Sequence, residues 1–338
     1  MGRDMTEPAE YQPGQTTRSV DAPPALEHLR TVAAEMRDRL DSCRKHGDAP
    51  KVEAVHQLRT GTRRVEATLE TLAREAGARG LGQTAEEARQ CWLRQLKKVR
   101  RASGTVRDLD VHRELLADNF LPPADSAPDK VAAELVEATS SAAAGSGEIT
   151  PLIQQARALD QWLKDRRSAA AEALCSTLDD HAQRLLDAEQ RFLAAIAKRR
   201  SVLRRAQRPA VRLALEDYLR LMDAMPLLDK ENLHDFRKGA KKARYVAEAD
   251  DSDPTAAAMA KAVKRVQDAI GEWHDWVVVA QEAQEALGKN GASLQAELEA
   301  HAQHGYAHAL RVTTTMGRRF VGEWRALQPR RARSPRVP

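Results

Sequence analysis

The sequence predicts an all-α protein built from two related helical bundles. Its composition is 42% hydrophobic and 30% charged, with helix-forming Ala, Leu, Glu, Arg and Lys dominating and only 4% aromatic residues. Apolar residues recur at helical spacing through nearly the whole chain, and no segment shows the alternating pattern of a strand. An internal sequence repeat indicates that the two bundles arose by duplication.

The apolar spacing gives a succession of helical segments. In order, they are expected at about 23–45, 51–77, 83–103, 106–119, 151–206, 209–225, 230–250, 255–271, 274–288 and 291–325. The breaks after residues 103 and 271 rest on Gly104 and Gly271, because glycine commonly ends a helix. Asp108 and Asp275 then come early in the next helices, where a carboxylate caps free N–H groups or interacts with the helix dipole.

The domain organisation follows from the same pattern. The chain has 338 residues, enough for one large domain or two modest ones. We expect a disordered segment at 1–21, one folded unit at 22–326 and a basic disordered tail at 327–338. The folded unit would divide into a first half at about 22–165 and a second half at about 166–326, connected by a long helix.

The overall charge says little about a partner. The net charge is +5, because 49 acidic residues nearly balance 54 basic ones, so the positions of the basic residues matter more than their number. Cys43, Cys91 and Cys175 lie far apart without a CxxC pair. With neither a secretory signal nor a membrane-length apolar run recognised, we expect reduced thiols and a cytoplasmic protein.

Two blocks of basic residues recur in the second half in the same order. The first block pairs His56 with His234, Arg59 with Arg237, Arg63 with Lys241 and Arg64 with Lys242. The second block pairs Arg94 with Lys261, Lys97 with Lys264 and Lys98 with Arg265. Two matching blocks with the same charge type are hard to attribute to chance.

Within the first block the cations share one face of a helix. Residues three, four or seven apart lie on the same side, so His56, Arg59 and Arg63 form a stripe. The matching stripe contains His234, Arg237, Lys241 and Arg244. Like charges this close repel each other, which indicates neutralisation by an anion; a solvated face with acidic partners explains a single stripe equally well. Phosphate suits converging stripes, because arginine offers a planar fork of donors and lysine a concentrated charge.

The candidate anion-binding residues are the cations and histidines of these blocks and of the corners that follow them. They are His56, Arg59, Arg63, Arg64, Arg94, Lys97, Lys98, Arg101, Arg107, His234, Arg237, Lys241, Lys242, Arg244, Lys261, Lys264, Arg265 and His274. The sequence alone does not show which of them point inward.

These motifs resemble those of the CHAD family of α-helical domains over about residues 22–326. The pattern His-x-x-Arg-x-x-x-Arg-Arg occurs at His56, Arg59, Arg63 and Arg64, and an Arg-Asp-x-Asp-Val corner at Arg107, Asp108, Asp110 and Val111. The second half has His-x-x-Arg-x-x-x-Lys-x-x-Arg-Tyr at His234, Arg237, Lys241, Arg244 and Tyr245, and a Gly-x-x-x-Asp corner at Gly271 and Asp275. The chain departs from the pattern at Glu66, where another arginine is usual, and at Trp273 and Trp276.

The resemblance implies two pseudo-symmetric four-helix bundles around a basic central cavity. It also implies binding of inorganic polyphosphate without catalysis and without a cofactor, and it makes polyphosphate granules an expected location. An accessory or regulatory module of a phosphate-metabolising enzyme is an alternative.

An enzyme and a metal site are further alternatives. The sequence has no P-loop, HExxH or Glu-x-Glu-x-Lys signature, and Glu297-Leu298-Glu299-Ala300-His301 lacks the lysine. His301, His304 and His308 share a helix face and could hold a metal, although one helix rarely supplies three ligands. We therefore expect neither catalytic residues nor a metal.

A nucleic-acid binder and a purely structural scaffold also remain open. Phosphate contacts alone give salt-sensitive affinity for either polymer, but single-strand binders usually add aromatic residues for base stacking. The aromatic residues near the basic blocks are Trp92, Phe236, Tyr245, Trp273 and Trp276. If they serve core packing, a base-free polyphosphate chain is favoured.

Overall fold

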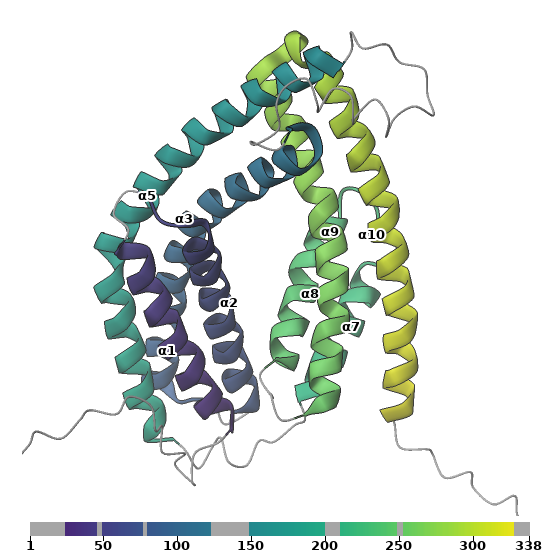
Figure 1. Cartoon of the computed structure of the whole chain (residues 1–338). Coiled ribbons are helices and arrows are strands. Elements are labelled where there is room, and N and C mark those ends of the chain that lie inside the picture. Colours follow the sequence, from purple (N-terminus) through teal and green to yellow (C-terminus); the bar gives the residue numbers. More distant parts are fainter. Residues whose placement is uncertain are drawn as a thin grey trace, which may run out of the picture.

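The computed structural model describes residues 24–45, 49–76, 80–122, 149–199, 210–248 and 253–327, which are helical apart from short connections. The elements are α1 (Pro24–Arg44), α2 (Val52–Glu75), α3 (Gln83–Phe120), α5 (Ile149–Ala197), α7 (Ala210–Ala224), α8 (Leu233–Ala247), α9 (Pro254–Leu287), η2 (Gly288–Gly291) and α10 (Ala292–Leu327). They form an arch with two legs (Figure 1). The all-α prediction is confirmed, whereas the segment 1–21 and all of the tail but Leu327 lie outside the described residues.

The first leg is a four-helix bundle of α1, α2, the first part of α3 and the C-terminal half of α5. The apolar residues of α5 repeat at steps of three and four, which turns one face of that helix into the core. This face comprises Ala171, Leu174, Leu178, Ala182, Leu185, Ala188, Phe192 and Ile196. Trp92 of α3 packs against Phe192 with ring centroids 5.9 Å apart, so both aromatic rings serve the core.

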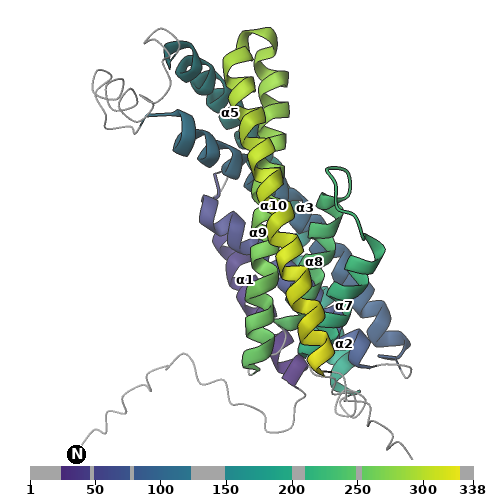
Figure 2. The same cartoon turned by 90° about the vertical axis from the view of Figure 1, so that its right-hand side faces the viewer.

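The second leg is a four-helix bundle of α7, α8, α9 and α10. Its centre is Tyr218, whose ring meets Phe236 at 5.7 Å and Phe320 at 4.7 Å. The first turn of α9 is stabilised by Asp253, whose carboxylate accepts a hydrogen bond from the Thr255 amide at 2.8 Å. Figure 2 shows α9 and α10 as a long hairpin that extends beyond the rest of this leg.

A third core at the top of the arch joins the legs. It gathers the ends of α3, α5, α9 and α10 through Leu109, Leu116, Leu159, Leu163, Trp276, Val279, Leu294 and Leu298. Trp276 is 4% exposed and lies between two rings, stacking on His301 at 4.4 Å and meeting Phe120 edge-on at 6.3 Å. The two legs are thus held together by a shared apolar cluster as well as by the chain.

The expected helix breaks at Gly104 and Gly271 are wrong. Both α3 and α9 run without interruption through these glycines, and Asp108 and Asp275 lie inside helices rather than at N-caps. The helices continue because each contributes to a leg core below the glycine and to the third core above it. The division expected near residue 165 falls within α5, whose first part contacts the third core and whose second half contacts the first leg.

Candidate functional site

Arg59 and Arg63 of α2 lie on the side of the first leg that faces the second. Arg59 is only 25% exposed, and its Nη2 lies 3.3 Å from Asp108 Oδ1 of α3. Burial lowers the pKa of Arg59, Asp108 opposes this shift, and Arg63 and Arg237 add to it. Because Arg237 belongs to α8, the effect shows that arginines of the two legs approach each other.

Arg237 of α8 approaches from the second leg. Its Nε donates a hydrogen bond to the Gln267 carbonyl of α9 at 3.1 Å, which fixes the side chain against that helix. Burial lowers the pKa of Arg237, Asp275 opposes the shift, and Arg63 of the first leg adds to it. The guanidinium is therefore subject to carboxylates, of which Asp275 has the largest effect, and to a cation of the other leg.

Lys241 lies one turn further along α8. Burial, followed by Arg237, Arg63 and Arg59, lowers the pKa of this amine to about 6. Within the described part of the chain, neither Lys241 nor Arg63 forms an ion pair with a carboxylate. Both are partly buried, and neither has a carboxylate at ion-pair distance among the described residues.

Arg100 of α3 joins these residues and was not predicted. It pairs with Glu66 of α2, and its pKa is lowered by burial and then by Arg63. In the repeat, Glu66 corresponds to Arg244 and Arg100 corresponds to Gln267. There Arg244 Nη1 donates to Gln267 Oε1 at 3.0 Å, so the same two positions contact each other in both halves. The positive charge that Glu66 removes from α2 is supplied by Arg100.

We call Arg59, Arg63, Arg100, Arg237 and Lys241 the central cluster. The carboxylates that act on it are Glu66, Asp108, Asp275 and, at Arg237, Asp268, which are fewer than its cations. Burial raises the pKa of Asp275 against the opposing effect of Arg237, so this carboxylate is itself short of solvation. A partly buried group of like charges with too few counter-charges is costly to the fold and attracts anions.

The two repeated glycines, Gly104 and Gly271, lie against the side chains of the two repeated arginines, Arg59 and Arg237. A Cβ added to Gly104 would lie 3.5 Å from Arg59 Nε, and one added to Gly271 would lie 2.5 Å from Arg237 Nη2. Both glycines are buried inside their helices. At Gly271 the Arg237 guanidinium occupies the space of a Cβ, whereas at Gly104 a Cβ would make only van der Waals contact with Arg59. The interpretation of both glycines as C-caps did not anticipate these contacts.

We expect Gly104→Ala to raise the free energy of unfolding by about 1 kcal/mol, since alanine is favoured over glycine inside a helix and its Cβ fits beside Arg59. Gly271→Ala should gain much less, because Arg237 must move and lose its hydrogen bond to Gln267. Urea denaturation of both variants measures the difference. Equal gains would show that Arg237 is not seated on Gly271.

Two contacts between the legs lie further along α2. Arg74 makes a bidentate ion pair with Asp217 of α7, with 2.6 Å between Nη1 and Oδ2. Lys242 of α8 forms an ion pair with Glu70, with 3.0 Å between Nζ and Oε2. Lys242, a predicted anion-binding residue, is thus paired with a carboxylate of the first leg. The legs therefore contact each other at these ion pairs and at the third core, and the central cluster lies between the two contacts.

The predicted histidines lie in equivalent pairs beside the cluster. The rings of His234 and His274 are in contact, with centroids 4.2 Å apart and planes tilted by 43°. Burial and then His234 lower the pKa of His274 to about 4. His56 is more exposed, and its pKa is lowered by burial and then by Arg107, the residue that matches His274. Arg107 also lies 3.8 Å from Glu114.

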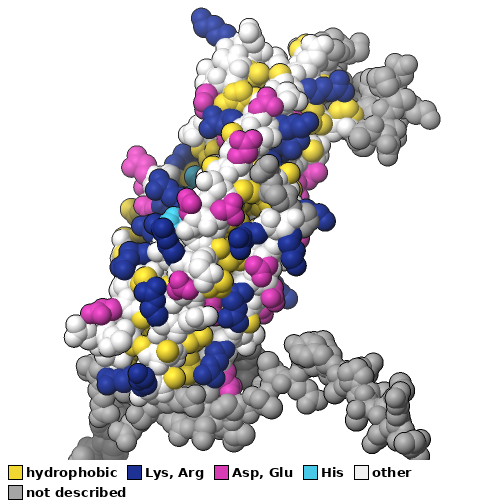
Figure 3. Space-filling view, turned by 90° about the vertical axis from the view of Figure 1, so that its left-hand side faces the viewer, with side chains coloured by type: hydrophobic (Ala, Val, Ile, Leu, Met, Phe, Trp, Pro, Cys, Tyr) yellow, Lys and Arg dark blue, Asp and Glu magenta, His cyan; other side chains and the backbone are white. Residues whose placement is uncertain are grey.

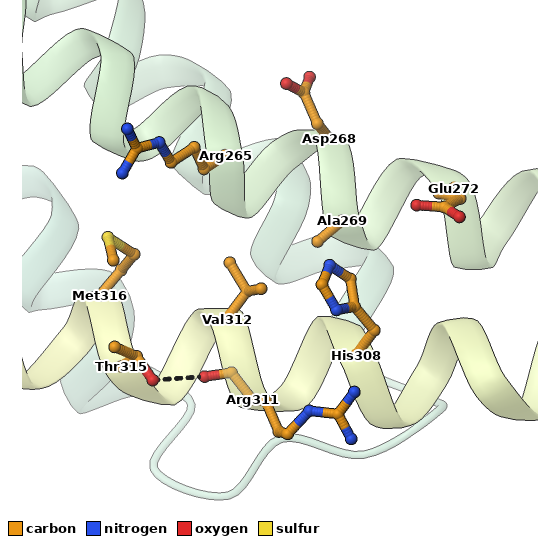
Figure 4. Close-up of a pocket in the computed structure, with 9 residues that line it drawn as sticks. All are labelled: Arg265, Asp268, Ala269, Glu272, His308, Arg311, Val312, Thr315 and Met316. Atoms are coloured by element: carbon orange, nitrogen blue, oxygen red, sulfur yellow. Dashed lines mark hydrogen bonds between the residues drawn. The ribbon is translucent and has the colours of Figure 1, made fainter.

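The remaining predicted cations lie outside the central cluster. Arg94, Lys97, Lys98, Arg101, Lys261, Lys264 and Arg265 are exposed on α3 and α9. Lys264 pairs with Asp268 at 2.6 Å, and Arg64 lies 3.7 Å from Glu35 in a pocket between the legs that Tyr245 also lines. Arg265 lines an outer groove between α9 and α10 (Figure 4).

The outer face of the first leg differs from the inner one. Figure 3 views the molecule from the side of α5 and α1, where lysines and arginines alternate with acidic side chains. Examples of this pairing are Arg37 with Glu189 at 2.6 Å and Arg44 with Asp179 at 3.8 Å. Cations of α1 thus have carboxylate partners on α5.

The histidine face of α10 is divided between two environments. His301 stacks on Trp276 in the third core, whereas His308 lines the outer groove with Arg265. Among the described residues, no group of three His, Cys, Asp or Glu side chains is arranged to hold a metal ion. None of the described helices combines the length and the apolar character that a bilayer crossing requires.

The fold and the site define an all-helical protein in which two joined bundles share a cluster of partly buried cations. The family described as "CHAD domain" matches residues 27–284, and the chain belongs to this family. No curated protein matches the sequence.

The chain shares its fold with several solved structures, including the following two. The crystal structure of the CHAD domain from the plant Ricinus communis has a TM-score of 0.53 and 16% identity, and the match covers 95% of this chain and 98% of that one. PptA from Streptomyces chartreusis has a TM-score of 0.50 and 17% identity, over 88% of this chain and 98% of its own.

Proposed function

We propose that the chain binds inorganic polyphosphate, without catalysis, at the central cluster. The observation that carries this proposal is the convergence of five cations from α2, α3 and α8 with too few carboxylates to neutralise them. A chain of phosphates supplies repeated negative charge at a spacing that several side chains contact together. Binding of polyphosphate is a known property of the CHAD family, which supports this choice of anion.

The aromatic residues favour polyphosphate over single-stranded nucleic acid. Trp92, Phe236, Trp273 and Trp276 are at most 4% exposed and belong to the cores. Tyr245 is 8% exposed, and the Arg244 guanidinium covers its ring at 4.5 Å from the centroid. These rings therefore offer no free face on which a base could stack.

The exposed cations of α3 and α9 are proposed as secondary contacts for a long chain. Such contacts strengthen binding as the polymer lengthens, because additional phosphates reach additional side chains. We further propose that this binding brings the protein to polyphosphate granules, which fluorescence microscopy of a tagged chain with and without polyphosphate tests.

The proposal is tested by titration with polyphosphates of defined length at several salt concentrations. With the cluster engaged, the logarithm of affinity should fall against the logarithm of salt with a slope of about −3 to −5, and more steeply for longer chains. Single-stranded DNA competing at the same salt serves as the comparison. Equal or tighter binding of DNA would overturn polyphosphate as the ligand.

A further inference from the structure

Lys241 occupies an unusual place in the central cluster, because it is surrounded mainly by other cations. Lys241 is partly buried on α8, one turn after Arg237, whose side chain is fixed on the Gln267 carbonyl, and among the described residues it has no carboxylate at ion-pair distance. The charged groups around it are Arg59 and Arg63 on α2, His234, Arg237 and Arg244 on α8, and Asp275 on α9. Asp275 is itself shared with Arg237, so it does not compensate Lys241 alone. An amine in such surroundings is more stable without its proton.

The arginines of the cluster cannot lose a proton in this way. A guanidinium keeps its proton at any physiological pH, whereas the lysine amine loses its proton readily when it is buried among like charges. Burial and then the neighbouring arginines lower the pKa of Lys241 to about 6, so the amine is largely neutral at neutral pH. The free protein thus reduces the repulsion within the cluster by giving up one charge.

A bound polyanion reverses this balance. Phosphate oxygens beside Arg59, Arg63 and Arg237 cancel the repulsion that destabilises the ammonium form, and they accept its hydrogen bonds. We propose that binding of a polyphosphate chain at the central cluster protonates Lys241, so that one proton is taken up from solution for each chain bound there and affinity falls as the pH rises. This inference rests on the proposed function and adds its regulation by pH.

The sign of the pH dependence follows from the two states. Well below the pKa of the free amine, which is about 6, Lys241 is already protonated, so binding takes up no proton and affinity is greatest. Above that pKa each binding event must first protonate Lys241, which lowers affinity by up to tenfold per pH unit until the pKa of the bound state is reached. Over the two pH units above the free pKa we expect affinity to fall by up to about 100-fold.

The experiment is calorimetry with long-chain polyphosphate at pH 8 in two buffers of different ionisation enthalpy, such as Tris and HEPES. Long chains make the titration of terminal phosphates negligible, and at pH 8 the neighbouring histidines, whose pKa values are lowered, stay neutral. We expect an uptake close to one proton per cluster occupied. Lys241→Arg keeps a cation there that cannot deprotonate, so its uptake should vanish and its affinity should no longer fall with pH.

Lys238→Arg is the matched control, because Lys238 is an exposed lysine one turn away on α8 and pairs with Asp235 at 2.9 Å. It should retain the full proton uptake. Competitive labelling of amines with acetic anhydride gives an independent readout: Lys241 should react at pH 7 far faster than its burial suggests, and polyphosphate should protect it.

The outcomes separate the two proposals. Binding without proton uptake, or equal uptake by Lys241→Arg, would overturn the role of Lys241 and leave the proposed function intact. Absence of any polyphosphate binding would overturn both.

Discussion

Arg63→Glu is expected to weaken polyphosphate binding strongly while raising the free energy of unfolding. Arg63 acts on Arg59, Arg100, Arg237 and Lys241, and within the described residues it has no carboxylate partner of its own. A glutamate at this position would form ion pairs inside the cluster and neutralise it. Loss of a charged hydrogen bond together with a new repulsion should weaken binding by at least about 100-fold, or ~2.7 kcal/mol.

The opposite changes in binding and stability distinguish a binding site from a structural cluster. Arg318→Glu, at an exposed position on α10, is the control for an equal change in net charge and should alter binding little. Arg63→Gln should fall between wild type and Arg63→Glu in both properties. Titration calorimetry and urea denaturation measure the two effects. A destabilised Arg63→Glu that still binds polyphosphate would mean that the cluster serves the fold.

The stripes of α2 and α8 could be predicted because their spacing is local. Arg59 and Arg63, like Arg237 and Lys241, are four residues apart, so any helix places each pair on one face. That the two faces meet, and that Arg237 of one leg acts on Arg59 of the other, depends on how the bundles pack. The arrangement in pairs was thus accessible from the sequence, whereas the cluster itself was not.

Arg100 was missed because it lies in a run of cations. Lys97, Lys98 and Arg101 differ from it only in their angular position around α3, and all three of them are exposed. A signal was present: Arg100 lies four residues after the buried Leu96 and four before Gly104, so it shares a face with core positions. Using that signal requires knowing that α3 continues through the glycine.

The helix breaks predicted at Gly104 and Gly271 were wrong for a related physical reason. Glycine ends helices because it adopts a positive φ, and it also allows close approach because it has no Cβ. The positive φ is seen at Gly288, where α9 ends, whereas Gly271 stays helical beneath Arg237. Whether a glycine ends a helix or allows close packing depends on the side chain that packs against it, and that side chain is far away in the sequence.

Trp276→Ala is expected to destabilise the protein by about 3–5 kcal/mol and to separate the legs. The ring lies in the third core, stacked on His301 and edge-on to Phe120, so its removal leaves a cavity where α3 and α10 meet α9. Once the top of the arch loosens, Arg59 and Arg237 no longer stay close together. Polyphosphate affinity should then fall even under conditions where each bundle remains folded.

Phe192→Ala separates loss of arch geometry from loss of stability in general. Phe192 is fully buried in the first leg against Trp92, so its removal should cost a similar free energy without changing how the legs face each other. Small-angle scattering should show expansion for Trp276→Ala only, and binding at low temperature should weaken for that variant only. If both variants lost affinity equally, stability alone would govern binding. A loss confined to Trp276→Ala would mean that an apolar contact at the top of the arch maintains an electrostatic site between its legs.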